Sequence, residues 1–140
     1  MTINRSLAFL AASVAILAFS GANAAEGLDH KPGLWETRVQ VAGRTMVTQM
    51  CTDAATEARN NATTAAYMKE HCTKNEQSQQ GDKFVNDSDC TFAGHHVVGH
   101  GVTTRIGDGA FHTEGTIISD AKWLGPCKAG QKPGDVMRQR

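Results

Sequence analysis

The sequence predicts a mainly β (α+β) fold: a curved or partly closed antiparallel sheet of about six to seven strands, with one helix after the first hairpin and two disulfides. Three observations predict it. Runs of alternating apolar and polar residues recur along the chain, separated by glycine-containing turn signals. One alanine-rich stretch with helical signals interrupts them. Four cysteines, an even number, favour two disulfides in an exported chain.

The first 24 residues predict a secretory signal peptide. Arg5 precedes an apolar run from Leu7 to Phe19, and small residues lead to a cleavage site near Ala24. A membrane anchor is the alternative, but a span needs about 20 apolar residues and this run is shorter. We expect a periplasmic or secreted protein with no stable membrane anchor after cleavage, and a single β-rich domain over residues 25–127.

The charge balance argues against nucleic acid as a partner. The chain has 14 Lys and Arg and 14 Asp and Glu, and cleavage of the predicted leader removes one cation, Arg5. The remaining chain is close to neutral, whereas nucleic-acid-binding domains usually carry a basic patch or a high isoelectric point. Polyanions and acidic membrane surfaces are therefore poor candidates as partners.

The first hairpin is predicted by "LWETRVQV" and "RTMVTQMC", two alternating runs joined by the turn residues Ala42-Gly43. This register opposes Val41 to Arg44 and gathers apolar side chains on one face of the hairpin. Because the helix that follows is alanine-rich and covers a sheet only thinly, we predict that this face binds a small apolar ligand. The candidate ligand-binding residues are Trp35, Val39, Met46 and Met50.

The segment from Thr52 to Cys72 predicts one helix or two short ones packed loosely on the sheet. Thr52 or Asp53 can cap its N-terminus, and Glu57 early and Lys69 late suit the helix dipole. Its apolar content is mostly alanine, and Asn60-Asn61 interrupts the pattern.

The cysteines are predicted to pair as Cys72 with Cys90 and Cys51 with Cys127. A three-residue loop, Gln80 to Asp82, would set Cys72 directly opposite Cys90, within the reach of a disulfide. The two remaining cysteines then pair with each other. A zinc site is the alternative, but no two cysteines lie two to four residues apart, as structural zinc sites usually require.

A third hairpin is predicted at Asp108-Gly109, which read as a two-residue turn. This turn opposes Ile106 to Phe111 and puts both on a buried face that also carries His96 and His100. A last short strand from Lys122 to Cys127 follows. The polar residues 128–140 predict a disordered C-terminal tail.

Three of the six histidines lie in "HHVVGHG", from His95 to Gly101. In a straight strand His96 and His100 are about 13 Å apart, whereas one metal ion needs its ligands at about 2.0 to 2.1 Å. A β-bulge at Gly99 is the one arrangement that could bring them together. Ordinary strand histidines are favoured, and a weak metal-binding or metal-buffering protein using His96, His100 and His112 is the alternative function.

Enzyme activity is the second alternative. Glu36, beside Trp35, could be a general acid if its apolar neighbour raised its pKa, and Glu114 is another acidic candidate. The sequence contains no Rossmann glycine pattern, no G-x-S-x-G nucleophile elbow and no C-x-x-C motif. We therefore expect no cofactor and assign no catalytic residue.

"KPGLWE" from Lys31 to Glu36, the order of the four cysteines and "WLGPC" from Trp123 to Cys127 together resemble the domain of unknown function family 3617. The resemblance covers roughly Lys31 to Cys127. It implies a small exported protein of Gram-negative bacteria, mostly antiparallel β, with no established activity. The leading hypothesis is a non-enzymatic protein that binds a small apolar ligand or an envelope protein.

Overall fold

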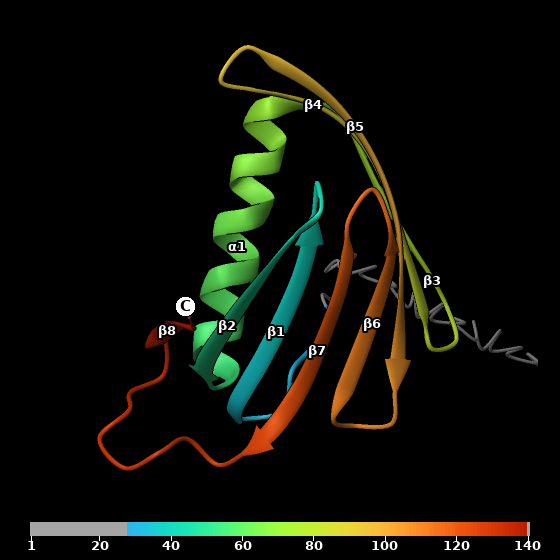
Figure 1. Ribbon diagram of the computed structural model, residues 1–140. Helices are drawn as coiled ribbons and strands as arrows, with labels where there is room; N and C mark the ends of the chain where they lie inside the picture. The colour runs from blue at the N-terminus through green and yellow to red at the C-terminus, as the bar shows by residue number, and fades with distance from the viewer. Residues whose placement is uncertain (1–27, 140) are drawn as a thin grey trace, which may run out of the picture.

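The computed structural model describes residues 28–139 (Figure 1). The predicted signal peptide, residues 1–24, lies outside them. The described chain forms one antiparallel sheet and one helix. The elements are β1 (Gly33–Val41), β2 (Arg44–Thr52), α1 (Ala54–His71), β3 (Cys72–Gln80), β4 (Lys83–Phe92), β5 (His95–Ile106), β6 (Ala110–Gly115), β7 (Ile118–Gly125) and β8 (Val136–Gln139).

The strand order is β3-β4-β5-β6-β7-β1-β2-β8. The predicted class, a mainly antiparallel β fold with one helix and two disulfides, is confirmed. Two details are wrong: the sheet has eight strands rather than six to seven, and it is open rather than partly closed. It stays open because β3 and β8 end the strand order on opposite sides and do not pair, as Figure 1 shows.

The chain after Cys127, where the polar sequence predicts a disordered tail, returns to the sheet. Val136–Gln139 pair with β2 as the short strand β8. Two hydrogen bonds lead into this strand, from the Cys51 amide to the Asp135 carbonyl (3.1 Å) and from the Gly134 amide to the Cys51 carbonyl (2.8 Å). Because the Cys51–Cys127 disulfide starts this segment beside β2, only a short return is needed for it to pair there.

The first two hairpins show how turns and bulges set the register. Val41 opposes Arg44 as predicted, and both turn residues, Ala42 and Gly43, have positive φ, as a type I′ turn requires. In the second hairpin Gln80 opposes Lys83, so the loop has two residues and not the predicted three. A register shift between Cys72 and Lys74 compensates for this difference. Both predicted disulfides, Cys72–Cys90 and Cys51–Cys127, are present.

The third hairpin differs from the prediction by one residue. Ile106 pairs with Ala110, so its loop has three residues, from Gly107, at φ 60°, to Gly109. Phe111 therefore opposes Arg105 and not Ile106. When the register between two strands shifts by one residue, side chains that would share a face of the sheet lie on opposite faces instead. The prediction that His96 and His100 share a buried face with Phe111 is therefore wrong: both are exposed, on the other face.

Residues Ala54–His71 form one continuous helix, without a break at Asn60-Asn61. Asp53 is the N-cap, and its side chain accepts a hydrogen bond from the Thr56 amide at 2.8 Å. Thr56 and Glu57 are the only buried residues of the helix. The helix is therefore not held by an apolar face along its length. It is not a membrane span either, since no helix of the described chain is long and apolar enough to cross a bilayer.

The core is small and lies beside the N-terminal end of α1. Trp35 and Phe111 stack with ring centroids 5.5 Å apart, and His30 packs edge-on against both. The strand registers place Trp35, Phe111 and Phe92 on the same face of the sheet. We call it the helix-side face, because Tyr67 of α1 stacks on Phe92 there. The opposite face, which carries Glu36, is called the far face.

Candidate functional site

The four predicted ligand-binding residues lie together on the helix-side face. Trp35 opposes Met50, and Val39 opposes Met46, on β1 and β2. They differ in exposure: Trp35 is 2% exposed, whereas Met46 is 58% exposed. Trp35 is held in the core, where its Nε1–H also donates to the Lys31 carbonyl at 2.9 Å. It can therefore support a binding surface from below, while the two methionines and Val39 can form the surface itself.

Helix α1 is attached to this face near its two ends. Near the N-terminal end the Glu57 carboxylate accepts a hydrogen bond from the Thr52 hydroxyl at 2.7 Å and contacts His30 Nδ1 at 3.0 Å. Near the C-terminal end Tyr67 and Phe92 stack with parallel rings, 5.6 Å between centroids. Figure 1 shows α1 rising from the end of β2 to the region of β4 and β5.

Between these attachments the helix does not cover the sheet. Residues 58–66 of α1 are all exposed, although six of the nine are alanine or threonine residues small enough to pack closely. On the helix-side face Val41 and Met46 remain exposed, and they line a shallow hollow together with Arg44. The arrangement leaves apolar side chains open to a ligand, with one guanidinium at the rim.

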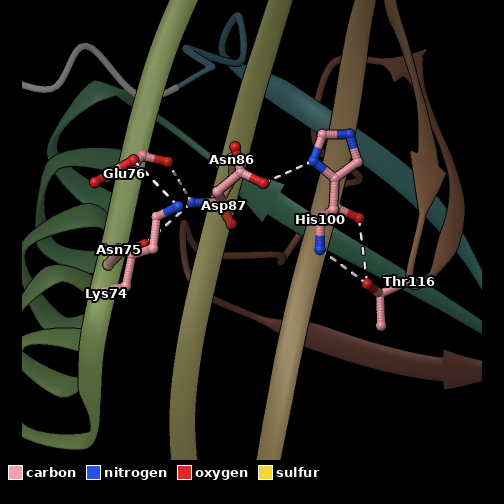
Figure 2. A network of polar contacts seen from close by, with 7 residues as sticks. All are labelled: Lys74, Asn75, Glu76, Asn86, Asp87, His100 and Thr116. Atoms are coloured by element: carbon pink, nitrogen blue, oxygen red, sulfur yellow. Dashed lines mark hydrogen bonds and ion pairs between the residues drawn. The ribbon is translucent and has the colours of Figure 1, made fainter.

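The three metal-candidate histidines do not converge. His100 Nδ1 contacts Asp87 at 2.7 Å (Figure 2), and His96 Nε2 contacts Asp89 at 2.7 Å. His112 contacts other acidic residues, Asp120 at 2.6 Å through Nδ1 and Glu114 at 3.3 Å through Nε2. Over residues 28–139 no three His, Cys, Asp or Glu side chains are grouped so as to hold a metal ion.

The β-bulge at Gly99 that could have brought His96 and His100 together is not present. β5 pairs with β4 in an unbroken register in which Gly99 opposes Ser88. The glycine has a different physical reason: a Cβ added there would lie 2.7 Å from Ser88 Oγ. The absence of a side chain at Gly99 therefore leaves room for the Ser88 hydroxyl on the neighbouring strand. Because the register is unbroken, His96 and His100 stay as far apart as in a straight strand.

The histidine–carboxylate pairs are electrostatically coupled. The hydrogen bond from His100 lowers the pKa of Asp87. In the other direction, hydrogen bonds to Asp120 and, secondly, to Glu114 raise the pKa of His112. The charged form of Asp87 is thus favoured by His100, and that of His112 by Asp120 and Glu114, so both histidines contact carboxylates on the far face.

The surroundings of Glu36 lower its pKa, whereas a carboxyl group that acts as a general acid needs a raised pKa. It is 7% exposed, accepts hydrogen bonds from Gln49 Nε2 at 3.0 Å and Arg38 Nε at 3.2 Å, and lies 3.6 Å from Lys122 Nζ. These contacts, the Gln49 hydrogen bond first, lower its pKa, so the expectation of a raised pKa is wrong. Glu114, the second acidic candidate, is an exposed residue that pairs with His112.

Sequence reasoning missed the buried polar contact among Thr52, Glu57 and His30. Glu57 in the first turn of a helix is a visible signal, but it indicates only a favourable helix dipole. His30 precedes the first strand by three residues and carries no local pattern. The contact forms because the core places the start of α1 over the segment that leads into β1.

The fold and its candidate site define a class: a small protein with one open antiparallel sheet, two disulfides and a single helix attached to one face. The chain belongs to the family described as "Protein of unknown function (DUF3617)", whose model matches residues 30–127. The match confirms the family that "KPGLWE" and "WLGPC" suggest. No curated protein and no solved structure matches the chain.

Proposed function

We propose that this is an exported, non-enzymatic binding protein that accepts a small apolar ligand on the helix-side face of its sheet. One observation carries the proposal: α1 is attached to that face near its ends and leaves Met46 and Val41 exposed, with Val39 and Met50 half-buried beside them. Exposed apolar side chains that are grouped on one face of a small protein mark binding surfaces more often than isolated ones do.

The compartment is part of the proposal. Two disulfides in a domain with a small core are typical of proteins in oxidising compartments such as the periplasm. The predicted signal peptide at residues 1–24 supports the same location. An envelope protein is the alternative occupant of the helix-side face, and direct binding of small apolar probes distinguishes the two.

The experiment uses two apolar residues of similar exposure on opposite faces. Met46, 58% exposed, lies on the helix-side face, and Val98, 64% exposed, lies on the far face. The oxidised protein is titrated with 1-anilinonaphthalene-8-sulfonate and with a medium-chain fatty acid, and native mass spectrometry of protein from the periplasm of an expression host detects any retained small molecule.

We expect the wild type to bind the dye and the fatty acid, Met46→Asp to lose most of that binding, and Val98→Asp to retain it. An equal loss in both variants would show that the probes bind apolar surface without preference for this site. A wild type that binds neither probe and carries no extra mass contradicts the small-ligand proposal and leaves the envelope protein as the occupant to test.

A further inference from the structure

The two edges of the sheet differ in how they are covered. At one edge the short strand β8 pairs with β2. At the other, β3 is nine residues long, and no strand of the described chain pairs with its outer side. All residues from Thr73 to Gln80 are exposed. An edge strand of this length presents a row of unpaired N–H and C=O groups, to which a further strand can hydrogen-bond.

A groove of about 550 Å³ lies between this edge strand and α1. Its walls are mostly apolar, with Ala65 and Met68 on the helix, and they also carry the ammonium group of Lys69 and amide groups from Asn61, Asn75 and Gln77. Amides both donate and accept hydrogen bonds. The groove is therefore suited to side chains with an aliphatic stem and a terminal amide, which a strand added beside β3 would project onto the helix-side face.

We propose that a second copy of this chain adds its own β3 to this edge, antiparallel and about a two-fold axis at Asn75. Charge decides the register. With Asn75 opposite itself, Lys74 of one copy faces Glu76 of the other, twice. Lys74 and Glu76 are neighbours on the same face of β3 (Figure 2), and Lys74 Nζ lies 3.3 Å from Glu76 Oε2. The pairing thus joins two opposite-charge pairs into a group of four.

Neighbouring registers are less favourable. An axis at Glu76 sets Glu76 against Glu76, and an axis at Lys74 sets Lys74 against Lys74; like charges directly opposed across strands are destabilising. An axis at Gln77 leaves both charges opposite neutral residues. The edge is therefore complementary to itself in one register and not in the adjacent ones.

The same register also fills the groove. Alternate side chains of β3 lie on the helix-side face, so Asn75 and Gln77 of the second copy project beside the amides that line the first copy's groove. By symmetry each copy completes the groove of the other. The partner that fits this edge is a strand with polar amides on one face and one cation and one anion, two residues apart, on the other. β3 is such a strand.

Sedimentation velocity on the oxidised protein over a wide range of concentrations tests the proposal. We expect a concentration-dependent dimer for the wild type. Lys74→Glu and Glu76→Lys should each be monomeric, and an equimolar mixture of these two variants should regain the dimer. Arg44→Glu makes the same change of charge as Lys74→Glu at an exposed site on β2 and should leave the dimer intact.

Disulfide cross-linking tests the register. Residues directly opposed in antiparallel strands are about 4.5 to 5.5 Å apart, within disulfide range, so Asn75→Cys should form a covalent dimer. Gln79→Cys should not, since its two copies would be about 26 Å apart. A wild type that is monomeric at every concentration, a dimer that Arg44→Glu disrupts equally, or cross-linking through Gln79→Cys alone would overturn the proposal.

Discussion

Removing the Cys51–Cys127 disulfide should destabilise the protein more than removing Cys72–Cys90. The first joins residues 76 positions apart and the second residues 18 apart. The loop-closure entropy of the unfolded chain then predicts a loss of about 4.5 kcal/mol for the long loop and about 3.2 kcal/mol for the short one. Against a typical domain stability of about 5 to 15 kcal/mol, either loss is large.

The structure adds a local reason to this difference. Cys51 is fully buried, and its backbone hydrogen-bonds to Asp135 and Gly134 at the entrance to β8. Without the long disulfide, only those hydrogen bonds and the β2 pairing retain the C-terminal strand. We therefore expect the amides of β8 to lose protection from hydrogen exchange when Cys51 and Cys127 are both alanine.

The assay is urea unfolding followed by circular dichroism, with the double variants Cys51→Ala/Cys127→Ala and Cys72→Ala/Cys90→Ala compared with the wild type. Free energies extrapolated to water are compared, because an unlinked unfolded chain also changes the denaturant slope. The reasoning is refuted if the Cys72→Ala/Cys90→Ala variant loses as much free energy of unfolding as the other, or if it alone exposes β8.

Two further predictions concern the far face and the "HHVVGHG" strand. Because Asp120 and Glu114 raise the pKa of His112, the folded protein binds that proton more tightly than the unfolded chain; the contribution to stability is complete below about pH 6.5 and is lost as the pH rises through the raised pKa. The difference in free energy of unfolding between the wild type and His112→Gln should therefore decrease above about pH 6.5, and a difference independent of pH contradicts the coupling. Gly99→Ala should destabilise the wild type by bringing its methyl group against Ser88 Oγ, and should do so less in a Ser88→Ala background, as measured by a double-mutant cycle; additive losses would show that this contact is not the cause.

Local chemistry explains which parts of the fold were predictable. Ala42-Gly43 closes the first hairpin in the predicted register, because both residues adopt positive φ and form the two-residue turn whose twist matches that of the flanking strands. Gly107-Asp108-Gly109 permits both a two-residue and a three-residue loop, and the sequence alone does not distinguish them. The loop with three residues is the one that accompanies stacking of Phe111 on Trp35, a contact between strands that are not adjacent in the sequence.

The candidate site divides in the same way. The alternation of β1 and β2 was enough to place Trp35, Val39, Met46 and Met50 on one face, because strand periodicity is local. Their exposure was not predictable, since it depends on where α1 is attached. Similarly, Glu36 carries a lowered pKa because Gln49 from β2 and Lys122 from β7 reach it, and neither is its neighbour in the sequence.

The sequence by itself determined the family, the antiparallel β class, the helical segment after the first hairpin and the pairing of Cys72 with Cys90 and Cys51 with Cys127. Those features depend on the periodicity of apolar residues, on turn residues and on the order of the cysteines. Each of these can be read directly from the sequence, because none requires knowing which strands become neighbours. Only the tertiary structure decided that His96 and His100 are exposed and contact Asp89 and Asp87, that residues 136–139 return to the sheet as a strand, and that β3 forms an open edge. Each of these depends on which strands become neighbours, and strand neighbours are set by long-range packing that a local pattern does not encode.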